Sequence, residues 1–200
     1  YDFTSPTPNI GANHSAYAEL MRGNISNVSY YNRALTPIEI RQNYQALLPR
    51  FAVTDGLVLN LDAGNRKSYP ATGTTWTDLT GNGNDGTLTN GPTFDSSNGG
   101  SIVFDGVNDY VVNSSFTSHQ INIGTLEWWI KTPAIFPFNG YFGGVGGTTT
   151  FGASRSLRIY NGYFSFPTYG SATEDWNNIL IPTTNTWYHI VQIWNGTSLT

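Results

Sequence analysis

The amino-acid sequence predicts an all-β protein with one short surface helix. Charged residues make up 11% of the 200 residues and aromatic residues 14%, and Gly, Asn, Ser and Thr are abundant. This balance favours short strands and polar turns over helices. From Gly56 to Val111, apolar segments alternate with turns rich in Gly, Asn and Asp. A chain of this length can enclose a single large β core.

The first predicted elements are a strand at residues 25–31 and a helix at about residues 36–48. β-branched and aromatic residues dominate the strand. Thr36, Pro37 and Glu39 form a capping box with proline at the first helical position. We expect Leu35 and Ile40 to form a hydrophobic staple. We also expect the helix to bury one stripe, made of Ile40, Tyr44, Leu47 and Leu48.

Further strands follow from the period-two pattern. Leu57, Leu59 and Leu61 alternate with polar positions, and residues 126–131 alternate in the same way, so that Trp128 and Trp129 should face opposite sides. Strands are also predicted at 102–104, at 110–112 and at 188–194. Two hairpins are expected, one through residues 105–109 and one at residues 156–166 around Asn161-Gly162.

Charge, cysteine content and hydropathy exclude several classes of protein. The net charge is −4 and the nine Lys and Arg residues are scattered, which argues against nucleic-acid binding. There is no cysteine, so disulfides and thiolate metal sites are excluded. No run of about 18 apolar residues predicts a membrane span, and residues 1–10 do not resemble a signal peptide.

Several segments resemble laminin G-like modules of the concanavalin A-like class. They are LDAGN at 61–65, DLTGNGNDGTL at 78–88, SIVFDGVNDYV at 101–111, and residues 24–48, which begin NISNVSYYNRALTPIE. The resemblance implies a two-sheet antiparallel jelly-roll sandwich. The chain is similar to modules repeated in phage virion proteins, bacterial adhesins and extracellular enzymes. This similarity implies an extracellular or virion-surface location.

The order of these segments predicts an unusual domain organisation. Residues 1–51 resemble the C-terminal part of such a module, and residues 52–200 resemble the N-terminal and middle part of a following one, incomplete at Thr200. A window cut from a tandem array is the favoured interpretation, and a circularly permuted single domain is the alternative. Half a sandwich leaves unpaired strand edges, so the first segment must pack on something.

Catalysis is not expected. Glycosidases of this fold need two carboxylates about 5–9.5 Å apart, but Glu127 is followed at i+2 and i+4 by Trp129 and Lys131. Glu174 and Asp175 are adjacent and would point to opposite faces of a strand. His14, His119 and His189 lack metal-site or triad spacing. A glycoside hydrolase is therefore the minority alternative.

Calcium is the one cofactor that the sequence suggests. Hard oxygen ligands gather in turns, and Asp105 and Asp109 are the first candidate ligands, because related modules hold calcium near such loops. The competing interpretation is turn chemistry, in which Asp and Asn bond to their own backbone. The further candidates are Asp62, Asp78, Asn82, Asn84, Asp85 and Asn108.

Sugar binding would use aromatic faces beside amide and carboxylate groups. Trp76, Tyr169 and Trp176 fall in turn-rich segments, and Asn108 lies in a loop, so these four are the candidate ligand-binding residues. The sequence thus predicts a non-catalytic module that binds glycans, a host surface or neighbouring subunits. A purely structural fibre or decoration domain of a virion is the main alternative.

Overall fold

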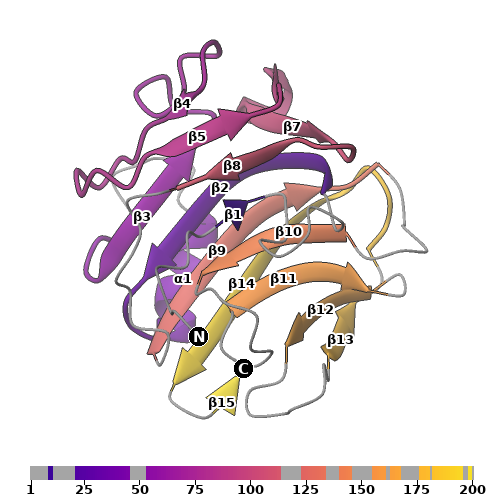
Figure 1. Ribbon diagram of the computed structural model, residues 1–200. Coiled ribbons are helices and arrows are strands. Elements are labelled where there is room, and N and C mark those ends of the chain that lie inside the picture. Colours follow the sequence, from indigo (N-terminus) through magenta and orange to yellow (C-terminus); the bar gives the residue numbers. More distant parts are fainter. Residues whose placement is uncertain are drawn as a thin grey trace, which may run out of the picture.

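The described residues form two antiparallel β-sheets and one α-helix (Figure 1), which confirms the all-β class. The computed structural model describes residues 9–10, 21–45, 53–113, 123–133, 140–145, 155–160, 163–167, 176–180, 182–195 and 198–199. The predicted jelly-roll connectivity goes beyond what these two sheets establish.

The first sheet has seven strands in the order β15-β14-β9-β2-β7-β6, with β3 also paired to β2. Its strands are β2 (Arg22–Tyr31), β3 (Leu57–Asp62), β6 (Thr93–Asp95), β7 (Ser101–Asp105), β9 (Ile123–Lys131), β14 (Trp187–Asn195) and β15 (Ser198–Leu199).

The second sheet has eight strands in the order β13-β12-β11-β10-β1-β8-β5-β4. Its strands are β1 (Asn9–Ile10), β4 (Thr75–Trp76), β5 (Gly86–Thr89), β8 (Tyr110–Val112), β10 (Gly140–Val145), β11 (Arg155–Tyr160), β12 (Tyr163–Pro167) and β13 (Trp176–Leu180).

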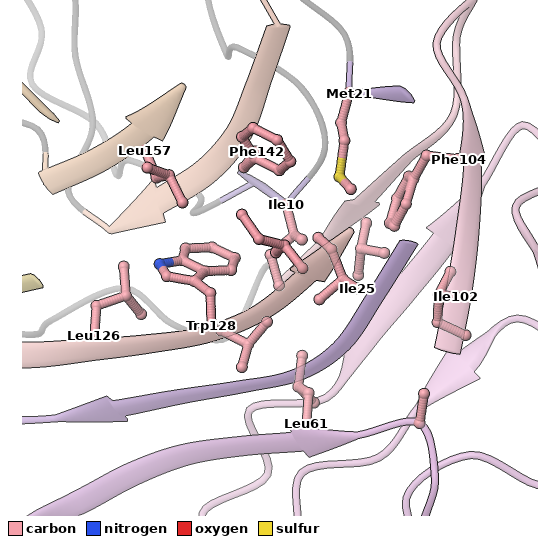
Figure 2. Packing of buried hydrophobic residues seen from close by; sticks show 14 of the residues in the cluster. Ile10, Met21, Ile25, Leu61, Ile102, Phe104, Leu126, Trp128, Phe142 and Leu157 are labelled. Carbon is pink, nitrogen blue, oxygen red and sulfur yellow. The ribbon is translucent and has the colours of Figure 1, made fainter. Parts of the chain in front are cut away.

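One hydrophobic cluster unites the two sheets. Figure 2 shows Trp128 of β9 facing Phe142 of β10 and Leu157 of β11, and all three are at most 1% exposed. Within β9, Leu126, Trp128 and Ile130 point into this core, whereas Trp129 is only partly buried. The prediction that the two adjacent tryptophans face opposite sides is therefore confirmed. Burial of each such side chain stabilises the fold by about 1.5–3 kcal/mol.

Strand β2, which lies within the first 51 residues, pairs with strands from the rest of the chain. It pairs with β9 on one edge, and on the other edge with β7 from Arg22 to Ile25 and with β3 from Asn27 to Tyr31. Gly23 has φ of +146°, and a Cβ there would collide with the carbonyl oxygen of Lys131. A strand from the segment predicted to be the C-terminal part of one module thus lies in the same sheet as strands from the segment predicted to begin the following module.

The helix α1 (Pro37–Gln45) begins where the capping box predicts. Thr36 N donates to Glu39 Oε2 at 2.8 Å, and Glu39 N donates to Thr36 Oγ1 at 3.3 Å. The predicted buried stripe is wrong for the described part of the helix, since no residue of α1 is buried. Ile40 is partly buried and packs against a small cluster of Tyr31, Leu35 and Val53. Leu47 and Leu48 lie outside the described residues.

The predicted hairpin through residues 105–109 is wrong. β7 pairs with β6 and β2, whereas β8 pairs with β1 and β5, so this loop carries the chain from one sheet to the other. Local turn chemistry does not reveal whether the next strand continues the same sheet. The second hairpin is confirmed, because Tyr160 of β11 pairs with Tyr163 of β12.

Candidate functional site

Of the four residues predicted to bind a ligand, three belong to the described structure, and it does not bring them together: β4, which carries Trp76, and β13, which carries Trp176, are the opposite edge strands of one sheet. Trp76 is 0% exposed and belongs to the core, so its ring faces are covered. Trp176 begins β13 and pairs with Pro167. Asn108 is exposed, and its carbonyl oxygen accepts a hydrogen bond from Asn90 Nδ2 at 2.7 Å. Tyr169 lies outside the described residues.

The two predicted calcium ligands lie at the ends of the loop that crosses between the sheets. Asp105 Oδ1 accepts hydrogen bonds from the backbone N–H groups of Val107 and Asn108, and Asp109 Oδ2 accepts one from Asp105 N. Burial raises the pKa of Asp109, and the nearby charge of Asp105 acts in the same direction. Among the described residues, no three His, Asp or Glu side chains gather as a metal site would require.

A second loop, the acidic turn (residues 78–85), uses its polar groups internally. Asp78 is 5% exposed and accepts hydrogen bonds from Asn60 N, Thr80 N, Thr80 Oγ1 and Asn84 N. Asp85 Oδ1 accepts one from Asp78 N at 2.8 Å. These bonds satisfy backbone donors that the turn would otherwise leave unpaired.

The outer face of the seven-stranded sheet offers a different kind of surface. Side chains alternate along each strand, so those that do not enter the core point away from the other sheet. Pairing aligns His189 of β14 with Trp129 of β9, Trp129 with Asn27 of β2, and Asn27 with Asp62 of β3. We name these four residues the ladder. They cross three inter-strand spacings of about 4.8 Å, or about 14 Å in all.

Aromatic rings cover one end of the ladder. The rings of Trp129 and His189 stack at a centroid distance of 5.0 Å and an interplanar angle of 23°. Tyr44 of α1 stacks on Trp129 at 5.6 Å and 17°, and it remains 56% exposed. Two residues further along the same pair of strands, Lys131 Nζ lies 5.2 Å from the ring centroid of Trp187. These rings combine flat apolar area with neighbouring polar groups.

Polar groups cover the other end. Asn27 Nδ2 donates to Asn60 Oδ1 at 2.9 Å, and Ser29 Oγ donates to Asn27 Oδ1 at 3.0 Å. Asp62 Oδ1 accepts from Gly64 N, and burial raises the pKa of this carboxyl group. Asn27, Asn60 and Asp62 are only partly buried. Each of these side chains therefore keeps part of its surface open to a ligand.

Helix α1 is fixed against this face by Asn43. Its Nδ2 donates to both carboxylate oxygens of Glu127, at 3.2 and 3.1 Å, and to Tyr31 Oη at 2.9 Å, while its Oδ1 accepts from Val53 N. Glu127 is 4% exposed, and its Oε2 lies 3.7 Å from His189 Nε2. Burial, followed by the charge of Glu127, raises the pKa of Tyr31.

A second contact holds the start of the helix. The guanidinium of Arg33 donates to both carboxylate oxygens of Glu39, at 3.1 and 2.7 Å. This pair and the capping box lower the pKa of Glu39 to about 2. The helix that carries Tyr44 is thus tied at its first turn to the segment that follows β2, and at its centre to the sheet. On the far side of α1, an open hollow of about 380 Å³ is lined by Ile38, Arg41, Gln42 and Gln45.

Sequence reasoning missed this surface because its members come from five elements. Trp129 and His189 were placed on strands, and the outward direction of Trp129 was predicted, but no spacing links them to Asn27, Asp62 or Tyr44. The one indication of this surface in the sequence was the high aromatic content of the two strands that carry Trp129 and Trp187. Strand register, which the sequence does not state, brings these residues together.

The buried carboxylate of Glu127 lies beside the ladder member His189 and accepts hydrogen bonds from Asn43 of the helix. Among the described residues, no helix is long and apolar enough to cross a membrane. Comparison of the chain with protein-family models, with curated proteins and with solved structures gives no match.

Proposed function

We propose that this chain is a non-catalytic, laminin G-like jelly-roll module that binds glycans on the outer face of its seven-stranded sheet. The observation that carries the proposal is the ladder. It crosses four neighbouring strands, with aromatic rings at one end and amide and carboxylate groups at the other. A pyranose ring has an apolar face that stacks on aromatic rings and hydroxyl groups that bond to amides and carboxylates. The location proposed for the module is the cell exterior or the surface of a virion.

Three features favour sugar binding over a purely apolar contact. The ring of Tyr44 is 56% exposed, and its stacking partner Trp129 also stacks on the cross-strand neighbour His189. Asn27 and Asn60 are already oriented by the hydrogen bond between them, which reduces the entropy lost on binding. The ladder is also longer than one sugar ring, so that an oligosaccharide can contact both ends.

Calcium at Asp105 and Asp109 is a separate part of the proposal. Its support is the burial of Asp109 and the nearby charge of Asp105, which both raise the pKa of Asp109 and whose effect a bound cation would offset. A calcium-dependent rise in melting temperature that is absent in Asp109→Ala would support the site. The absence of any calcium effect on the parent protein would leave turn formation as the role of both residues.

The glycan test is an array measurement with the parent protein, in calcium and again in chelator. We expect binding to a restricted set of glycans, and at least about tenfold weaker binding, or about 1.4 kcal/mol, in Tyr44→Ala and Trp129→Ala. Tyr163→Ala is the matched control, because this exposed tyrosine lies on the other sheet. If the folded parent binds no glycan, the structural virion or surface domain becomes the better proposal.

A further inference from the structure

Gln192 is an anomaly in the interior of the protein. It lies on β14 between Ile190 and Trp194, on the side of the strand that faces the core, and it is 0% exposed. Neither its Oε1 nor its Nε2 atom has a hydrogen-bond partner among the residues that the structure describes. Burial of an amide without partners is costly, and native interiors rarely retain such a group.

A second unpartnered polar group lies on the neighbouring strand. Trp128 of β9 is 1% exposed, and its Nε1–H has no hydrogen-bond partner in the described part of the chain. In Figure 2 the indole nitrogen points toward the side where Leu126 and Leu157 lie. Leu126 is the residue that pairs with Gln192, and Trp128 itself pairs with Ile190. The indole N–H is therefore directed toward the part of the core that Gln192 occupies.

Strand geometry brings the two groups within reach of a common partner. Gln192 and Trp128 are diagonal neighbours on one face of an antiparallel pair, about 7–8 Å apart at the backbone. Their long side chains share the space between the sheets. Gln192 offers one acceptor and two donors, and Trp128 adds one donor. A buried water molecule needs two to four polar partners, and here two side chains supply them.

We propose that an ordered water molecule binds between the two sheets and joins the amide of Gln192 to the indole N–H of Trp128. The water accepts a hydrogen bond from Trp128 Nε1 and exchanges hydrogen bonds with the amide. It thereby fixes the rotamer of Trp128, whose strand neighbour Trp129 belongs to the ladder. The site does not depend on the proposed glycan binding.

The direction in which Gln192→Leu changes the melting temperature distinguishes a bound water from a core without one. If the water is bound, Gln192→Leu removes its main partner and leaves Trp128 Nε1 unpaired, so the melting temperature should fall by about 3–8 °C. If the amide is merely buried without partners, the same substitution removes a destabilising group and the melting temperature should rise. Leu126→Met, at the paired position, is the control and should change it less, because it conserves apolar volume.

A second measurement does not depend on any variant. In the unsubstituted protein, the Trp128 Hε1 proton should show a nuclear Overhauser effect to water with the long residence time of a buried molecule. A resolved Hε1 signal without such an effect overturns the proposal. A rise in melting temperature in Gln192→Leu overturns it as well.

Discussion

The acidic turn and the ladder contain the same types of polar side chain but use them differently. In the acidic turn, the carboxylate of Asp78 is consumed by donors from its own and adjacent segments. In the ladder, Asn27 and Asp62 make few internal bonds and remain partly exposed beside aromatic rings. A polar side chain therefore indicates a ligand site only when its hydrogen-bonding groups are not already used within the chain.

The largest loss of stability is expected from a substitution in the acidic turn. Asp78→Ala removes the acceptor of four hydrogen bonds and leaves backbone donors unpaired in a buried place. The free energy of unfolding should fall by about 2–4 kcal/mol, as measured by chemical denaturation. Asp55→Ala is the control, because that side chain is 89% exposed, and it should change stability by less than about 1 kcal/mol. Equal effects of the two substitutions would contradict a structural role for the acidic turn.

An intermediate effect is expected at the helix contact beside the ladder. Asn43→Ala removes the donor to Glu127 and the bond to Val53 N, so Glu127 loses a hydrogen-bonded neighbour in a buried site. Stability should fall by about 1–3 kcal/mol, and amide hydrogen exchange should accelerate within Pro37–Gln45. Gln45→Ala, at an exposed position of the same helix, should leave exchange in the sheet and helix nearly unchanged. Unaltered exchange in Asn43→Ala would show that α1 is held by other contacts.

The smallest effect is the acid sensitivity of the helix start. The folded-state pKa of Glu39 is lowered from 4.5 to about 2, chiefly by Arg33 and then by Thr36. A lowered pKa means that the ionised carboxylate stabilises the folded state above pH 4.5 and that this contribution is lost as the pH falls toward 2. Its size is about 0.5–1 kcal/mol for a partly exposed pair. Denaturation of Glu39→Gln should show a correspondingly flatter pH dependence in this range, and identical pH profiles would contradict the assignment.

Much of the fold could be predicted from local patterns, because strands and caps depend on neighbouring residues. The capping box at Thr36, the alternation of Trp128 and Trp129 and the hairpin between β11 and β12 are examples. The hairpin at residues 105–109 was predicted wrongly, since the same turn chemistry serves a crossing between sheets. The ladder could not be predicted, because it depends on the register of four strands that are distant in sequence.

The central position of β2 also bears on how the chain reaches its fold. Its two edges pair with β3, β7 and β9, all of which follow it in the sequence. During synthesis, residues 22–31 emerge long before β9 is available, so one edge of this strand must wait for its partner. Such non-local pairing slows folding and prolongs the exposure of an unpaired apolar strand. Premature termination before residue 131 would therefore release a chain prone to aggregate.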